Sequence, residues 1–203
     1  NRNRNAHVIT LEDPIEYLHR HKKSVVTQRE IATDTDSYIT GLRASLRQAP
    51  DVILLGEMRD HETISTAMTA AETGHLILST LHTIGAANTI DRVIDAFPSG
   101  QQQQIRTQLS MVLDAVISQQ LIPTVDGGVY PAFEIMFLNN AIRNMIRESK
   151  IHQIDGVIAT SQDEGMMSMD NSIIGLYKRG LVSKENAIAY SSNSELMAKK
   201  LDR

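Results

Sequence analysis

Three short apolar runs divide the first half of the chain. They are "HVITLE" (7–12), "DVILLG" (51–56) and "HLILSTLH" (75–82). Each run has the length and composition of a β-strand. The second run has no polar alternation, which is typical of a strand covered on both faces in a parallel sheet, and the third also predicts a buried strand.

Helical patterns separate these runs. Apolar residues recur at helical spacing in 37–48, 60–74 and 86–97, Ser37 and Asp60 are suitable N-caps, and Gly74 is a suitable stop. The resulting order is strand, helix, strand, helix, strand, helix. That order predicts an α/β fold with a parallel sheet and right-handed crossovers.

The second half of the chain has a different pattern. Apolar residues from Ile105 to Leu121 predict one long helix over 101–122. A strand is expected over 127–138, a helix over 139–150, and about three more helices after residue 151. We therefore expect two domains, 1–122 around the sheet and 123–203 mostly helical.

Composition narrows the function. The 203 residues include no Cys, which excludes a disulfide scaffold, a thiolate zinc site and a cysteine nucleophile. No apolar run approaches the roughly 18 residues of a membrane-spanning helix. The net charge of −4 gives no bulk attraction for nucleic acid or anionic membrane, although a local basic patch is compatible with it.

Polar side chains follow each predicted strand. In parallel sheets, ligands bind beyond the carboxyl ends of the strands, so the residues just after each strand are the place to look for a site. The candidates are Glu12, Asp13 and Glu16, then Glu57 and Arg59, and then Thr80, His82 and Thr83.

Two carboxylates are the strongest single candidates. Glu57 follows a buried strand and Gly56, so it resembles a Walker B acid that holds Mg²⁺ or its waters; the alternative is a solvated loop residue. Glu16 lies in an acidic turn and suits a general base or water-orienting residue; an ordinary acidic surface turn is the alternative.

The histidines and arginines are open to two readings. His75 and His82 bracket the third strand and suit phosphate contact or subunit coupling, but either one suits a structural role equally well. Arginines could contact phosphate or act in trans, whereas surface ion pairs are the alternative for most of them. The arginines concerned are Arg43, Arg47, Arg59 and Arg92.

The combination of motifs is far more specific than any one of them. "ITLEDPIEY", "LRQAPDVILLGEMRD" and "TGHLILSTLHT" resemble the Asp box, Walker B box and His box of the secretion-ATPase superfamily, the ring motors of type IV pili and type II secretion. "AIRNMIRE" (141–148) is similar to the signature of the pilus-retraction branch. The resemblance extends from about His7 to about Tyr190.

The resemblance implies a fold, cofactors and residue roles. The fold would be a RecA-like P-loop NTPase core followed by a mostly helical part, and the cofactors would be ATP and Mg²⁺. Glu16 would polarise the attacking water, Glu57 would act on Mg²⁺, and His75 and His82 would sense the nucleotide. Asp13, Thr80 and Arg59 would line the nucleotide site. The retraction signature would comprise Ala141, Ile142, Arg143, Asn144, Arg147 and Glu148.

One element of the family pattern is missing from this chain. A P-loop needs G-x-x-x-x-G-K-[ST] to cradle phosphates, and the sequence contains no such run. In the family the P-loop precedes the Asp box. We therefore expect the chain to be the C-terminal portion of a longer protein, with the first strand and P-loop outside it, and to bind ATP poorly alone.

The resemblance also implies partners and a location. The expected assembly is a cytoplasmic homohexamer at the inner face of the cytoplasmic membrane, where it would act on the inner-membrane pilus platform protein. No nucleic acid and no transmembrane segment are expected. Two alternatives stay open: a type IV secretion or conjugation ATPase, and a non-hydrolysing ring-binding module.

Overall fold

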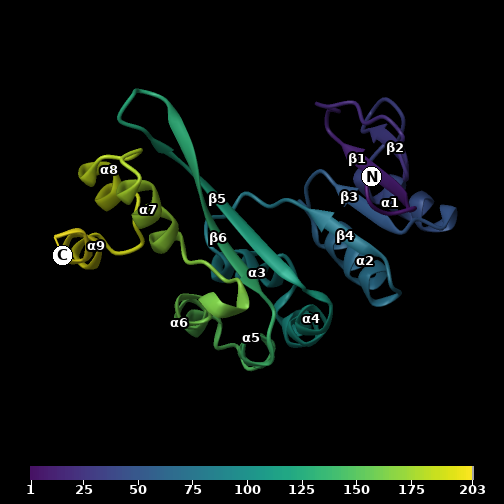
Figure 1. Ribbon diagram of the computed structural model, residues 1–203. Coiled ribbons are helices and arrows are strands. Elements are labelled where there is room, and N and C mark those ends of the chain that lie inside the picture. The colour runs from purple at the N-terminus through teal and green to yellow at the C-terminus, as the bar shows by residue number, and fades with distance from the viewer. Residues whose placement is uncertain (203) are drawn as a thin grey trace. The chain divides into compact units, whose positions relative to one another are not determined.

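The computed structural model describes residues 1–202, which form two compact units. The first comprises Asn1–His82 and Ala96–Gln101. The second comprises Thr83–Asp95 and the described residues from Gln102 onward. Figure 1 shows the purple and blue strands of the first unit and the teal hairpin and green to yellow helices of the second.

A four-stranded parallel sheet organises the first unit. Its strands are β1 (His7–Glu12), β2 (Val25–Glu30), β3 (Val52–Leu55) and β4 (Leu76–Ser79), in the order β2-β1-β3-β4. The α/β class and the parallel sheet are thereby confirmed. The prediction that the third strand is buried is wrong, because β4 is at one edge of the sheet and its Leu76 and Leu78 are exposed. β2 is an added edge strand that the apolar pattern does not predict, because only its first residues are apolar.

Two helices pack on this sheet. They are α1 (Tyr38–Ser45), extended by the short 3₁₀ turn η1 (Leu46–Gln48), and α2 (His61–Glu72). Leu42 of α1 and Ala67 of α2 join the strand residues Ile9, Leu11 and Ile53 in one buried cluster. The core is therefore aliphatic, and it fixes the strands whose ends carry the candidate site.

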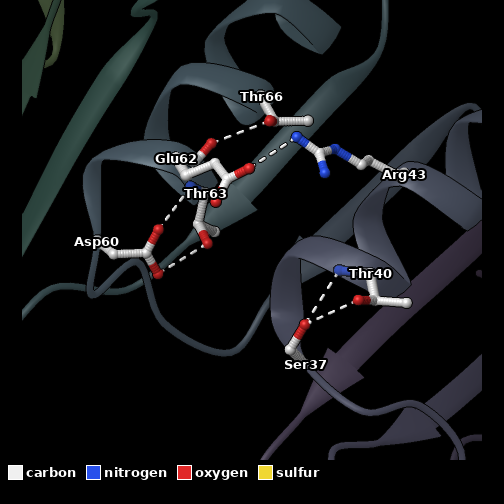
Figure 2. A network of polar contacts seen from close by, with 7 residues as sticks. All are labelled: Ser37, Thr40, Arg43, Asp60, Glu62, Thr63 and Thr66. Atoms are coloured by element: carbon white, nitrogen blue, oxygen red, sulfur yellow. Dashed lines mark hydrogen bonds and ion pairs between the residues drawn. The ribbon is translucent and has the colours of Figure 1, made fainter.

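Local hydrogen bonds set where these helices begin. As Figure 2 shows, Asp60 caps α2 by accepting from the Thr63 N–H at 2.8 Å and from the Thr63 hydroxyl at 3.0 Å. Ser37 caps α1 in the same way, through the Thr40 N–H at 3.2 Å. Both caps agree with the sequence prediction, and the Asp60 cap fixes the loop that follows β3.

An antiparallel hairpin organises the second unit. Its strands are β5 (Ala115–Pro123) and β6 (Val129–Phe137). The surrounding helices are α3 (Ala86–Asp95), α4 (Ser99–Val112, whose first turn belongs to the first unit), α5 (Asn140–Arg147), α6 (Ile154–Thr160), α7 (Met169–Lys178), α8 (Lys184–Ala189) and α9 (Ser194–Leu201), with 3₁₀ turns η2 (Ile151–Gln153) and η3 (Gln162–Glu164).

The predicted long helix over 101–122 is wrong in its second half. α4 ends at Val112, and β5 begins at Ala115. From there burial alternates: Val116 and Ser118 are buried, while Ile117 is exposed. The reason for the error is that Val112, Val116 and Leu121 recur at helical spacing, whereas the strand buries Val116 and leaves Ile117 and Leu121 on its exposed face.

The hairpin supplies one side of the second core. Ile122 and Ala132 pack with Ile173 of α7, Ala187 of α8 and Met197 of α9. Ile122 lies inside β5, at the place where the sequence suggests a domain boundary. The division into domains 1–122 and 123–203 stays a prediction.

A buried glutamate joins the hairpin to two helices. Glu134 of β6 is 8% exposed. Its Oε1 accepts from the Ala86 N–H at the start of α3 at 2.7 Å, and its Oε2 accepts from the Met169 N–H at the start of α7 at 3.4 Å. The carboxylate therefore lies at the positive ends of two helices.

Within residues 1–202, no helix combines the length and hydropathy that a membrane span requires.

Candidate active site at the carboxyl edge of the sheet

The parallel register brings three strand ends to one edge. Leu11 of β1 pairs with Leu55 of β3, which pairs with Ser79 of β4. The residues that follow these strands are therefore neighbours, as the sequence predicts. Gly56 joins the first two ends because its N–H donates to the Leu11 carbonyl at 2.7 Å.

Gly56 is tightly enclosed. A Cβ at this position would lie 2.8 Å from the Tyr38 hydroxyl and 3.1 Å from the Leu11 carbonyl oxygen. On the other side, the Thr80 hydroxyl donates to the Gly56 carbonyl. The backbone that delivers Glu57 is thus held between β1, α1 and the loop after β4, and any larger residue at position 56 would force its neighbours to shift.

Glu57 is the centre of the site. Its Oε1 accepts from Arg59 Nη2, and its Oε2 lies 3.2 Å from His82 Nε2. Arg59 Nη2 also lies 4.0 Å from an Asp13 carboxylate oxygen. Four of the predicted residues, contributed by the loops after three strands, therefore form one cluster.

The cluster is electrostatically asymmetric. Glu57 is only 15% exposed in its side chain, whereas that of His82 is 89% exposed. The hydrogen bond from Arg59 holds the pKa of Glu57 below its ordinary value; desolvation opposes this shift, and the His82 hydrogen bond reinforces it. Glu57 is therefore a stable anion whose partners can turn towards solvent or towards a ligand.

Tyr38 is a member of this site that sequence reasoning misses. Its pKa is raised by burial and by the negative charges of Asp13 and Glu57. No motif marks it, because Tyr38 is simply the first residue of a capped helix. Its proximity to the strand ends depends on the packing of α1, which a local pattern does not show.

The turn after β1 carries Glu16. Its backbone is held by β2: the Ile15 N–H donates to Glu30 Oε2 at 3.0 Å, and Gln28 Nε2 donates to the Tyr17 carbonyl at 2.9 Å. Glu16 itself is exposed, and no hydrogen bond or ion pair fixes its carboxylate within the described residues 1–202. The turn is therefore ordered, while the side chain is free to meet a ligand.

His75 lies elsewhere in the first unit. It immediately precedes β4, at the opposite edge of the sheet from His82. Its Nδ1 is 3.0 Å from the Ala70 carbonyl and 3.2 Å from the Thr73 hydroxyl, at the end of α2. These contacts fit the structural reading, and the predicted nucleotide-sensing role of His75 stays a prediction.

The predicted retraction signature forms α5 and its C-cap. Ile142 and Ile146 are fully buried, whereas Ala141, Asn144, Arg147 and Glu148 are exposed. Arg143 Nη1 donates to the Ser110 and Met111 carbonyls at 2.6 and 3.1 Å. The signature therefore divides into an anchoring side directed at the end of α4 and an outward side, and Ala141 lies on the outward side although it is apolar.

Among the other arginines, Arg43 follows the ordinary reading. Its Nη2 donates to Glu62 Oε1 at 2.8 Å across the surfaces of α1 and α2, as Figure 2 shows. Both side chains are more than half exposed. Arg43 is thus engaged in a surface ion pair away from the Glu57 cluster.

Together the fold and the site define a class. A parallel α/β sheet with an acid directly after a buried strand, beside Arg and His from adjoining loops, is an arrangement suited to nucleotide hydrolysis. The chain belongs to the Type II/IV secretion system protein family, whose sequence profile matches residues 1–172.

Curated relatives and a solved structure refine this placement. The chain is 52% identical over 194 residues to a "Twitching motility protein" of Neisseria gonorrhoeae, covering 95% of this chain and 52% of the relative. It is 51% identical over 181 residues to the "Type IV pilus retractation ATPase PilT" of Pseudomonas aeruginosa, covering 89% and 53%.

The fold similarity is equally extensive. The solved structure described as "Crystal Structure of the Pilus Retraction Motor PilT and Bound ADP" superposes with a TM-score of 0.88 at 47% identity, covering 96% of this chain and 55% of that one. The chain thus spans about half the length of the curated relatives it matches.

Proposed function

We propose that this chain is the C-terminal portion of an ATP-hydrolysing motor that retracts type IV pili, and that it includes part of the catalytic site at the carboxyl edge of the sheet. The observation that carries the proposal is the Glu57 cluster, in which one carboxylate at a strand end contacts Arg59 and His82. Its support comes from the relatives described as a twitching motility protein and a retraction ATPase, and from the structure described with bound ADP.

We infer that Glu57 would hold Mg²⁺ through the waters of the ion, because residues 1–202 offer no group of three or more His, Asp or Glu side chains that could bind it directly. Mg²⁺ keeps several waters and takes one or two carboxylates together with substrate phosphates. Glu57 supplies one such carboxylate, and both of its oxygens already have hydrogen-bonding partners. When bound, the ion would neutralise developing phosphate charge. Glu57 would orient its water shell, and Arg59 and His82 would be released from Glu57 towards phosphate.

The remaining residues would bind and orient. Glu16, exposed on its ordered turn, would hold the attacking water by accepting its proton. Asp13 and Thr80 would complete the nucleotide surface. Tyr38 would exclude water beneath Gly56. His75 would act through the end of α2 rather than by touching the nucleotide.

The proposed assembly is a homohexamer at the inner face of the cytoplasmic membrane, acting on the pilus platform protein. The outward side of the retraction helix offers Asn144, Arg147 and Glu148 for that partner. The anchored side, Arg143 with Ile142 and Ile146, would keep the helix rigid while force is transmitted.

A chimera tests this function in whole-protein form. The first half of the gonococcal relative, joined to this chain at the start of the matched region, would be expressed in a retraction-deficient strain and also purified. We expect restored twitching and Mg²⁺-dependent ATP hydrolysis. Glu57→Gln should lower kcat about a hundredfold or more, because it removes the charge that positions the cation.

Glu62→Gln is the matched control. It makes the same chemical change at an exposed carboxylate of α2 and should leave turnover intact. Hydrolysis without twitching would favour the secretion or conjugation alternative. A folded hexamer with no hydrolysis at all would favour the non-hydrolysing module and contradict the proposal.

A further inference from the structure

A basic surface stands out on the first unit. It consists of residues 1–6 and 17–24 and is called the basic loop surface below. These two segments contain no Asp or Glu, although the whole chain has a net charge of −4. The basic side chains are Arg2, Arg4, Arg20, Lys22 and Lys23.

These charges are exposed within the described residues. All five side chains are on exposed residues, and no ion pair among residues 1–202 involves any of them. The nearby acid Asp51 lines the same shallow pocket as Lys23. Its Oδ2 accepts from the His7 backbone N–H at 2.7 Å, so this carboxylate is already engaged.

The two segments are held together by hydrogen bonds. Asn1 Nδ2 donates to the Arg20 carbonyl at 2.8 Å, and the Lys22 N–H donates to Asn1 Oδ1 at 3.1 Å. The Ser24 hydroxyl donates to the Arg4 carbonyl at 2.7 Å. The charges therefore sit on an ordered platform, so binding would not require the loop to be ordered first.

Two exposed apolar side chains adjoin the charges. Tyr17 is 76% exposed and Leu18 is 87% exposed. Gln28 fixes this stretch, since its Oε1 accepts from the His19 N–H at 2.7 Å and its Nε2 donates to the Tyr17 carbonyl at 2.9 Å. An aromatic and an aliphatic residue beside clustered Lys and Arg are the composition of an interfacial membrane contact.

We propose that the basic loop surface binds anionic phospholipid headgroups, with Leu18 and Tyr17 inserted at the boundary of the acyl region. Leu18 favours this interpretation over a nucleic-acid surface, because Leu has no π-face on which a base can stack, whereas Tyr17 suits either partner. This inference rests on the proposed function in one respect only, which is the identity of the membrane that the surface would bind. Its test uses no ATPase readout, so the two can fail separately.

The test is sedimentation of the 203-residue chain with sucrose-loaded vesicles. At about 0.1 M NaCl, we expect binding to vesicles with roughly one-third phosphatidylglycerol in phosphatidylcholine, and little to phosphatidylcholine alone. Raising NaCl to about 0.5 M should weaken binding at least about tenfold. Equal binding to both vesicle types, or no binding to either, would overturn the proposal.

Charge reversal localises the surface. Arg20→Glu/Lys22→Glu/Lys23→Glu should reduce partitioning about a hundredfold or more, since each basic residue near an anionic surface contributes to attraction. Lys178→Glu/Lys199→Glu/Lys200→Glu makes the same change in net charge on exposed residues of α7 and α9 and should bind nearly normally. If both variants lost vesicle binding equally, net charge alone would explain the loss, and the assignment of binding to the basic loop surface would be contradicted.

A tryptophan probe tests insertion. The sequence has no Trp, so Leu18→Trp introduces a single reporter at an already exposed site. Its emission should shift to the blue with phosphatidylglycerol vesicles and be quenched by brominated lipid. Leu196→Trp on α9 should not respond. An unresponsive reporter at position 18, together with tight binding of a fluorescent DNA strand, would make the surface a nucleic-acid site and overturn the membrane reading.

Discussion

The carboxyl edge of the parallel sheet and the start of helices α3 and α7 are each organised around one glutamate. Glu57 is held by two side chains, Arg59 and His82, of which His82 is almost fully exposed. Glu134 is held by two backbone N–H groups and is almost fully buried. Side chains can rotate to a ligand, whereas helix N–H groups cannot. The first arrangement therefore suits exchange with a nucleotide, and the second suits permanent cohesion.

Glu134→Ala should give the largest effect on stability. It would leave the Ala86 and Met169 N–H groups buried without an acceptor, at a cost of about 2–4 kcal/mol in free energy of unfolding. Glu134→Gln, which keeps one carbonyl acceptor, should cost about half as much. Urea unfolding monitored by circular dichroism measures both. Equal losses for Ala and Gln would show that the one remaining carbonyl acceptor contributes nothing, and a loss near zero for both would show that the two acceptors do not matter.

Arg143→Ala should give the next largest effect. The guanidinium satisfies two carbonyls at the end of α4, so its loss should cost about 1–2 kcal/mol. Arg147→Ala, on the outward side of the same helix, should cost less than about 0.5 kcal/mol. Comparable melting temperatures for the two variants would refute the division of the helix into anchored and outward sides.

Glu57 should make a small contribution to the free energy of unfolding, and this contribution should depend on pH. Its folded pKa lies below the ordinary value of 4.5, so its contribution to stability is complete above about pH 4.5. That contribution is lost as the pH falls through the folded pKa. Arg59→Gln should raise the pKa of Glu57 in a carboxyl NMR titration. Glu148, whose pKa the hydrogen bond from Lys150 lowers, should not move and serves as the internal reference.

Arg43→Gln should have the smallest effect on the free energy of unfolding and on the site. It breaks an ion pair between two side chains that are each more than half exposed, which is worth less than about 1 kcal/mol. Neither the Glu57 titration nor turnover of the chimera should change. A large effect would mean that the α1–α2 surface belongs to the site after all.

The parts of the fold that could be predicted are those with an unambiguous local pattern. β1 and β3 are mainly apolar runs, and their parallel register brings Glu57, Arg59 and Asp13 to one edge. β2 and β5 could not be predicted in this way. "VVTQRE" has few apolar residues because it forms an edge. Val116 and Leu121, five positions apart, suit one helical stripe but lie on opposite faces of the strand that pairs with β6.

The contacts between side chains within the site could not be predicted from the sequence for a different reason. The encounter of His82 with Glu57 joins residues 25 positions apart, and Tyr38 reaches the site only through the packing of α1. The sequence pattern around His75 also allowed two interpretations, a nucleotide-contacting role and a structural role. It precedes the same strand that His82 follows, so strand direction alone separates the two histidines.

Gly56 makes mutational tolerance uneven along residues 51–60. Even Ala would bring a carbon to within 2.8 Å of the Tyr38 hydroxyl and 3.1 Å of the Leu11 carbonyl oxygen, so the Tyr38 side chain and the β1 backbone would both have to shift. By contrast, position 60 should accept any good helix cap, such as Ser, Thr or Asn. Laboratory evolution of this chain would therefore find more variation at position 60 than at position 56, although both positions lie between β3 and α2.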